Sequence, residues 1–147
     1  MGLKKTSSDP LSPAQRSALM AKVRSTGNRS TEIAVAAILR AARIRGWRRQ
    51  PKNIAGRPDF YFPSARLALF VDGCFWHGCP RCQRNTPSAR REFWVNKINN
   101  NRRRDEKIRR TLRWQGYRVF RVWEHSVSQE RWVLRLQAAL SKGPEVD

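Results

Sequence analysis

Apolar positions along the chain alternate between helical spacing and short continuous runs, which predicts helices interspersed with strands. Residues 12–26 predict a first helix, with Ser12 as its N-cap and Pro13 at the first helical position. A second helix is expected from Ser30, as its cap, to Gly46. Its apolar positions follow the helical period: Ile33, Ala37, Ile38, Ala41 and Ile44.

Three short segments in the middle of the chain predict strands. One of them contains a continuous apolar run from Leu67 to Val71, as expected of a strand that is buried on both faces. The three predicted strands comprise residues 47–50, 57–62 and 66–73. A turn around Pro63 and Ser64 would join the second strand to the third.

The C-terminal half predicts a long helix, a strand and a last helix. Residues 88–116 have a strongly basic middle and one apolar side, which comprises Trp94, Ile98, Ile108 and Leu112. Residues 117–123 predict a strand. Ser128 is expected to cap a last helix with these side chains inward: Trp132, Val133, Leu136 and Leu140. No repeat or linker interrupts the pattern, so we expect one α/β domain over residues 12–140, a flexible arm at 1–11 and a loose tail at 141–147.

Composition adds a strong charge bias to this pattern. The 147 residues include 31 Lys and Arg against 11 Asp and Glu, for a formal net charge of +20. Such a charge repels itself and attracts polyanions, so nucleic acid is the leading partner, with a ribosome-associated or merely basic protein as the alternative. No apolar run approaches the roughly 20 residues that span a membrane. The N-terminus also lacks the apolar region of a signal peptide, so no membrane partner is expected.

All three cysteines lie in the segment DGCFWHGCPRC, residues 72–82. Three cysteines cannot all pair with one another, and nothing indicates an oxidising compartment, so a disulfide framework is not expected. The two-residue gap between Cys79 and Cys82 is typical of zinc ligands, and Cys74 would be a third. The fourth ligand would be either His77, which is nearby, or His125, after the last strand. Buried free cysteines are the alternative.

Two acidic residues suggest a second metal site. Asp59 enters one predicted strand and Asp72 ends the next, and two carboxylates on adjacent strands can share a Mg²⁺ ion. The alternative is that Pro-Asp is a turn dipeptide and Asp72 a strand-end cap. A lysine often follows two residues after the second acid in such nucleases, but Cys74 is there instead. If zinc takes His125, then His77 is free to accept a proton.

Four motifs in order, GRPDF, FVDGCFWHGCP, EFW..KI..N..RD and GYRVFRVWE, resemble those of the very short patch repair (Vsr) endonucleases over nearly the whole chain. The resemblance implies a mixed central sheet flanked by helices, similar to type II restriction endonucleases, with a structural zinc site. It also implies a Mg²⁺-dependent enzyme that nicks DNA 5′ of the T in T·G mismatches left by deamination of 5-methylcytosine. The protein is expected to act as a monomer that associates with the nucleoid in a bacterial-type cytoplasm. A mismatch-repair protein is a candidate partner.

The resemblance also implies roles for individual residues. Asp59 would be the principal Mg²⁺ ligand, His77 would activate the attacking water, and Glu32 would assist through water or by orienting His77. Zinc would be held by Cys74, Cys79, Cys82 and His125. Phe75, Trp76 and Trp94 would form an aromatic wedge beside the mismatch, for which core packing is the alternative. Met20 and Val23 would approach the minor groove, and we interpret Arg102, Arg103 and Arg104 as phosphate contacts.

The chain departs from the best-known members of this family at the end of the third strand. Val71 and Asp72 replace Thr-His, so the Val71 backbone carbonyl and the Asp72 carboxylate would both be available to Mg²⁺. Cys79 is at a position where that subfamily has histidine, and His125 is at a position where it has cysteine. The number of zinc ligands therefore stays at four. The N-terminal arm and residues 83–87 do not match closely, which leaves the flanking sequence preference open. Relaxed mismatch or damaged-base specificity and a non-catalytic DNA-binding module are the alternatives.

Overall fold

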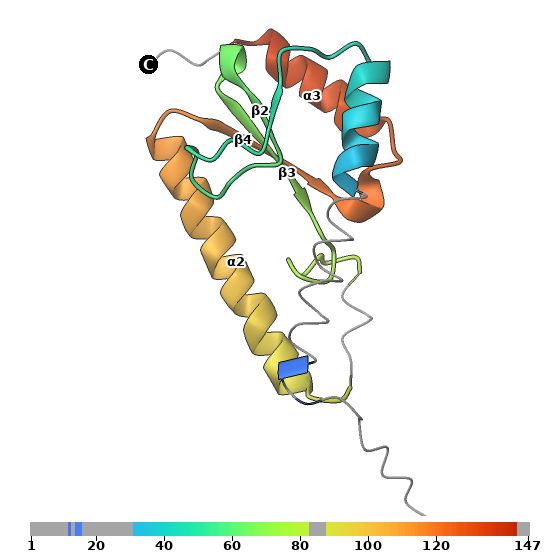
Figure 1. Ribbon diagram of the computed structural model, residues 1–147, viewed down its shortest axis with the longest axis vertical. Helices are drawn as coiled ribbons and strands as arrows, with labels where there is room; N and C mark the ends of the chain where they lie inside the picture. Colours follow the sequence, from blue (N-terminus) through green and yellow to red (C-terminus); the bar gives the residue numbers. More distant parts are fainter. Residues whose placement is uncertain (1–11, 13, 16–30, 83–87, 144–147) are drawn as a thin grey trace, which may run out of the picture.

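The computed structural model of the chain describes residues 12, 14–15, 31–82 and 88–143 (Figure 1). A helix covers residues 31–41. The elements after it are β1 (Arg48–Arg49), β2 (Phe60–Phe62), η1 (Pro63–Ala65), β3 (Leu67–Asp72), α2 (Arg91–Trp114), β4 (Arg118–Trp123), η3 (Glu124–Ser126) and α3 (Arg131–Ser141). The predicted order of helices and strands is therefore confirmed over these residues.

The four strands form one mixed sheet in the order β1-β2-β3-β4. The pairs β1–β2 and β2–β3 are antiparallel, whereas β3 and β4 are parallel. Parallel neighbours need a crossover connection, and α2 is part of it. This confirms the predicted α/β class with a mixed central sheet flanked by helices.

Helices cover both faces of the sheet because β3 has apolar side chains on both. Leu67 and Leu69 point into one core, together with residues of the helix over 31–41 and of α3. Ala68 and Phe70 point into the other, with Leu112 of α2. Figure 1 shows the same arrangement, with α2 on one side of the sheet and the other two helices opposite. Successive side chains of a strand point to opposite faces, so a continuous apolar run is what β3 requires.

The second predicted helix forms, but its expected apolar side is confirmed only in part, since Ile38 packs against the core and Ile44 is buried while the other predicted positions are exposed. Its buried side comprises Glu32, Val35, Ala36 and Leu39, whereas Ile33 is 54% exposed and Ala37 and Ala41 are also exposed. Both sets of positions have helical spacing, and the sheet selects the set that includes a carboxylate, Glu32.

This helix also ends at residue 41, before the expected end at Gly46. The chain turns at Arg43, which has a positive φ of 57°. The backbone N–H groups of Arg43 and Ile44 donate to the carbonyls of Arg40 and Leu39, at 3.0 and 2.9 Å. These bonds satisfy the last helical carbonyls one turn earlier than predicted.

Three further helix ends test the predicted caps. Ser12 Oγ accepts the backbone N–H of Gln15 at 3.2 Å, and Gln15 Oε1 accepts the N–H of Ser12 at 2.9 Å, which confirms Ser12 as an N-cap in a capping box. The long helix begins at Arg91, after Arg90 with φ 58°, rather than at Ser88. The last helix begins at Arg131 and not after Ser128, because η3 and a turn precede it.

Several predicted segments lie outside the described residues: the arm at 1–11, most of the first helix, and residues 144–147 of the tail. Within the described part of the chain, no helix has the length and apolar character needed to cross a membrane.

Candidate active site and metal centre

The predicted functional residues gather at one edge of the sheet because β3 and β4 are parallel and end together. Asp72, the last residue of β3, pairs in register with Trp123, the last of β4. The cysteine-containing loop follows Asp72, and His125 follows Trp123 two residues later. Two segments about fifty residues apart in sequence thus leave the sheet at the same edge.

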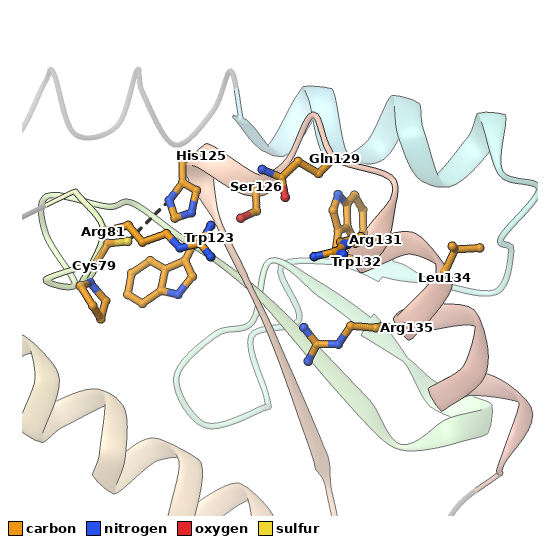
Figure 2. Close-up of a pocket in the computed structure, with 11 residues that line it drawn as sticks. Cys79, Arg81, Trp123, His125, Ser126, Gln129, Arg131, Trp132, Leu134 and Arg135 are labelled. Atoms are coloured by element: carbon orange, nitrogen blue, oxygen red, sulfur yellow. Dashed lines mark hydrogen bonds between the residues drawn. The ribbon is translucent and has the colours of Figure 1, made fainter.

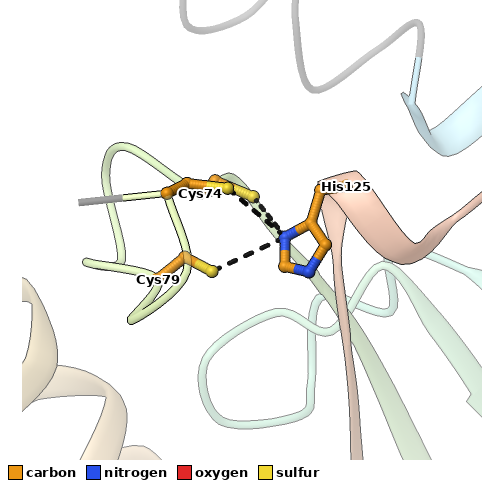
Figure 3. Close-up of side chains that lie close together, drawn as sticks. Cys74, Cys79 and His125 are labelled. Carbon is orange, nitrogen blue, oxygen red and sulfur yellow. Dashed lines mark hydrogen bonds between the residues drawn. The ribbon is translucent and has the colours of Figure 1, made fainter. Parts of the chain in front are cut away.

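Three cysteines and one histidine converge at this edge (Figure 3). The ligand atoms of Cys74, Cys79, Cys82 and His125 all lie within 4.8 Å of one another. His125 Nδ1 lies 3.2, 3.5 and 3.6 Å from the sulfurs of Cys74, Cys79 and Cys82, respectively. Sulfur and nitrogen ligands about 2.3 and about 2.1 Å from one tetrahedral ion lie about 3.6 Å apart. The donor set and its spacing therefore suit zinc.

The cluster also indicates which histidine is the fourth member. His125 joins the cysteines, whereas the His77 ring contacts carboxylates on the other side of the loop. Burial, reinforced by the neighbouring thiols of Cys82 and Cys79, raises the pKa of Cys74 to about 12. A bound cation would favour the thiolate form instead.

Asp59 is held beside the end of β3. Its Oδ2 accepts the backbone N–H of Val71 at 2.6 Å, so the carboxylate lies beside the residue whose own carbonyl, in the next peptide, was predicted as a metal ligand. Burial, together with the nearby carboxyl groups of Glu32 and Asp72, raises the pKa of Asp59 to about 7, although the hydrogen bond from Val71 lowers it. Negative charge is therefore crowded here, and hard oxygen donors in such a group fit a divalent cation such as Mg²⁺.

Glu32 is buried at 7% exposure and is anchored by two side chains from the β1 segment. Gln50 Nε2 donates to Glu32 Oε2 at 2.7 Å, and Arg49 donates to the same oxygen at 3.3 Å. The sequence interpretation did not identify these two partners. Their location next to a predicted strand was the only available signal, and it does not indicate which way they point.

Asp72 is buried at 4% exposure and faces a cation as well as the histidine. Its Oδ2 accepts a 2.8 Å bond from Arg121 of β4, and its Oδ1 lies 4.0 Å from His77 Nδ1. The guanidinium of Arg121 also stacks 4.8 Å from the ring centre of Phe70. Arg121 was not predicted, and it neutralises the carboxylate that this chain has in place of the family histidine.

His77 has its closest partner on α2. Its Nδ1 lies 2.5 Å from Asp105 Oδ2, and Arg121 lies 3.9 Å from the same oxygen. Burial opposes ionisation of Asp105, but the hydrogen bond and charge of His77, with the charges of Arg121 and Arg104, hold its pKa below the usual range. An ionised carboxylate at Nδ1 fixes the proton there and leaves Nε2 as the basic nitrogen.

The loop is further anchored to α2 through its backbone. Asn101 Nδ2 donates to the Trp76 carbonyl at 2.9 Å, and Arg102 donates to the Gly78 carbonyl. Asn101 and Asp105 are four residues apart, so they lie on the same face of the helix. Both occur in the third family motif but received no role from the sequence. Their spacing was the signal that could have identified them.

The predicted wedge residues form one aromatic cluster. The rings contact one another edge-on. The Phe75 ring centroid lies 5.1 Å from that of Trp76 and 5.4 Å from that of Trp94, and the centroids of the two tryptophans are 6.0 Å apart. All three are partly exposed. Phe93, which was not predicted, extends the cluster, with its ring 5.1 Å from Trp94 and 52% exposed. An apolar cluster at the surface next to His77 could contact bases.

Basic side chains border the same site. Arg102, Arg103 and Arg104 are exposed on α2, although Arg102 also binds the loop carbonyl. A cavity of about 360 Å³ lies among Asp72, His77, Asp105, Arg121, Arg102 and their neighbours. Its size and its mixture of acids and bases suit a phosphate group with its sugar. Met20 and Val23 lie outside the described residues.

Carboxylates beside a histidine at the edge of a mixed sheet are typical of metal-assisted phosphodiesterases. Comparison with protein families narrows this class, because the family described as DNA mismatch endonuclease Vsr matches residues 8–84. The chain belongs to the Vsr family and is a DNA-nicking endonuclease.

Relatives within this family carry two kinds of name. The type II nicking enzyme V.XorIIP of Xanthomonas oryzae pv. oryzae is 42% identical over 82% of this chain and 87% of its own length. V.NmeDIP of Neisseria meningitidis serogroup C, also a type II nicking enzyme, is 39% identical over 81% and 80%. The DNA mismatch endonuclease Vsr of Escherichia coli K12 is 40% identical, but over 53% and 50%. The longer similarity is to the nicking enzymes.

Proposed function

We propose that the protein nicks one strand of duplex DNA next to a mismatched base pair, and that T·G is the mismatch it cuts. One observation carries this proposal: His77 and the aromatic residues Phe75 and Trp76 are consecutive on one loop. The side chain of Asp105 and that of Asn101 hold this loop on α2. Recognition and chemistry therefore depend on the same few residues, which ties cutting to the site where the rings meet the DNA.

The aromatic cluster supports selection of a weakened base step. A wobble pair stacks poorly, so opening the step beside it costs less than opening a matched step, and apolar rings inserted there read that difference. The type II nicking enzymes among the relatives support strand nicking without pointing to one mismatch. The alternative is a Vsr-fold nickase with relaxed specificity or one directed at uracil or other damaged bases.

The geometry of the site supports the following catalytic roles. Asp59, with the Val71 carbonyl, would hold Mg²⁺, which supplies charge stabilisation at the scissile phosphate. Glu32 lies against Asp59 and adds negative charge there. Asp72 remains a candidate ligand through Oδ1, because Arg121 occupies Oδ2. His77 Nε2 would accept a proton from the attacking water as the water oxygen bonds to phosphorus and the P–O bond to the leaving sugar oxygen breaks. The leaving oxygen would take up a proton from solvent, and Asp105 would keep the imidazole ring oriented.

The test is a nicking assay with Mg²⁺ on duplexes that carry a single T·G pair in randomised flanks, followed by sequencing of the cut ends. Cuts confined to the position 5′ of the T, within a subset of flanks, are expected. Matched T·A duplexes with the same flanks are the control, and U·G duplexes test the alternative. Equal cutting of matched DNA would contradict the mismatch proposal and support a nickase of relaxed specificity.

A further inference from the structure

A second cavity, of about 690 Å³, lies on the other side of the zinc cluster, between the cysteine loop and α3 (Figure 2). Three arginines line it. Arg81 comes from the loop, between Cys79 and Cys82, and Arg131 and Arg135 come from the first turns of α3. Figure 2 shows the loop arginine entering from one side and the two helix arginines from the other.

The lining of this cavity is cationic and aromatic. Trp123 contributes a partly exposed ring, and Ser126 and Gln129 contribute polar groups. Trp132 also borders the cavity, but it is 4% exposed and its ring belongs to the core. Among the described residues that line it there is no Asp or Glu. Guanidinium groups with several parallel donors suit phosphate oxygens, and tryptophan rings suit the sugar or base next to a phosphate.

The N-terminus of α3 adds to the positive potential. The helix begins at Arg131, which lines the cavity, and no side chain caps this end by a hydrogen bond. The first N–H groups of a helix and its dipole both favour an anion. This end of α3 therefore reinforces the three arginines, although by itself it would define no site.

The cavity adjoins the catalytic one. Pro80 and Trp123 line both the 690 Å³ cavity and the 360 Å³ cavity that contains His77. A strand whose scissile phosphate lies beside His77 can thus continue past Pro80 toward the arginines without leaving the surface. This continuity favours the DNA backbone over a separate acidic protein as the ligand.

We infer that Arg81, Arg131 and Arg135 form a second phosphate-binding site, which holds the DNA backbone on one side of the nick. The inference rests on the proposed DNA substrate and extends it by naming where the flanking backbone lies. The inference predicts that the protein contacts more of the DNA backbone on one side of the nick than on the other, because the cavity adjoins the catalytic pocket on one side only.

The test compares the wild type with a triple variant, Arg81→Gln, Arg131→Gln and Arg135→Gln, by titration of labelled duplexes over a range of salt concentrations. The variant should bind at least about tenfold more weakly at low salt. The slope of log K against log salt should fall by about 2 to 3, because each lost phosphate contact removes about one unit. On duplexes shortened from one end up to the mismatch, the difference should vanish for one end only.

The control is a charge-matched triple variant, Arg40→Gln, Arg43→Gln and Arg45→Gln, at exposed positions that do not line the cavity. An equal loss of affinity in both variants would overturn the site, since it would reflect net charge alone. Loss that persists on both shortened duplexes, or no loss at all, would also overturn it. Matched duplexes are titrated in parallel, so failure of T·G nicking would leave this test of backbone binding interpretable.

Discussion

At the scale of single residues, the site combines charges that were predicted with partners that were not. Asp59, Glu32, Asp72 and His77 converge at one edge of the sheet. Arg121 and Asp105 complete this group, because Arg121 pairs with Asp72 and Asp105 pairs with His77. The residue type of Asp72 alone does not reveal that its carboxylate is already paired with Arg121. The consequences can be tested one residue at a time.

Asp59→Asn should abolish nicking while DNA binding remains, because the variant loses the charge that would hold Mg²⁺. The pKa of Asp59 is raised to about 7, so protonation stabilises the metal-free fold. This stabilisation is complete at pH values below the pKa that Asp59 has in the unfolded chain, and it is lost as the pH rises through about 7. Thermal melting of the metal-free protein should therefore show stability falling between about pH 4 and about pH 7, and the substitution should flatten this fall. Retained nicking would contradict the metal role.

Asp105→Asn should lower the nicking rate about 10- to 100-fold at neutral pH, because an amide no longer fixes the Nδ1 proton of His77. The affinity for DNA should change little. Glu92→Gln is the control, since Glu92 is an exposed acid in the first turn of α2 that does not line the cavity containing His77. A rate loss of the same size in the control would indicate a general effect on α2.

Trp76→Ala should reduce the preference for mismatched over matched duplex by about 1–3 kcal/mol, as for other stacked bases. The two binding constants measured on otherwise identical duplexes give this difference directly. Trp114→Ala is the matched control, because Trp114 is 87% exposed at the far end of α2. An equal loss on both duplexes would make Trp76 a packing residue.

At the scale of elements, the loop at 72–82 depends on close contact with α2. Gly78 has a positive φ of 64°, and a Cβ built there would lie 2.6 Å from Arg102 Nε and 2.7 Å from Ile98 Cγ2. Only glycine allows both the backbone conformation and the approach of the helix. Since Gly78 directly follows His77, the contact also sets the position of the ring that we propose as the general base.

Gly78→Ala should lower the free energy of unfolding by about 2 kcal/mol and reduce nicking, because the loop must move away from α2. Gly46→Ala separates the two causes. Gly46 has a φ of 78° but nothing within 4 Å of a built Cβ, so its substitution tests backbone strain alone, at about 1 kcal/mol. Denaturant unfolding and nicking rates measure both variants. Equal effects would show that the contact with α2 adds nothing.

At the scale of the whole molecule, the Cys₃His cluster joins the loop after β3 to the segment after β4. The positive charge of +20 opposes a compact state, and this link opposes the separation of the two strand ends. Zinc binding would therefore stabilise the edge of the sheet on which the catalytic residues lie.

His125→Ala should weaken zinc binding by more than about 100-fold and lower the melting temperature. Metal content after dialysis against a chelator measures the first effect. His77→Ala is the control, and it should keep the metal but lose nicking. Full zinc occupancy in the His125 variant would show that another residue completes the site.

Some features of the fold and of the candidate site could be predicted from the sequence, and others could not. The alternation of helical and strand periods predicted the α/β sheet, and the apolar run at 67–71 predicted a strand covered on both faces, because local periodicity reflects local geometry. The spacing of Cys79 and Cys82 predicted a metal cluster in the same way. The roles of Asp59 and His77 stay predictions, which rest on motifs in a defined order along the chain.

Only the tertiary structure decided which surfaces and partners these elements use. Glu32 is buried because the sheet covers its side of the helix, His125 joins the cysteines because β3 and β4 end side by side, and Arg121 and Asp105 reach His77 from separate elements. Such contacts join residues far apart in the chain, so no local period records them. The sequence alone determined the elements and the types of reactive group, and the packing of the elements determined which groups meet.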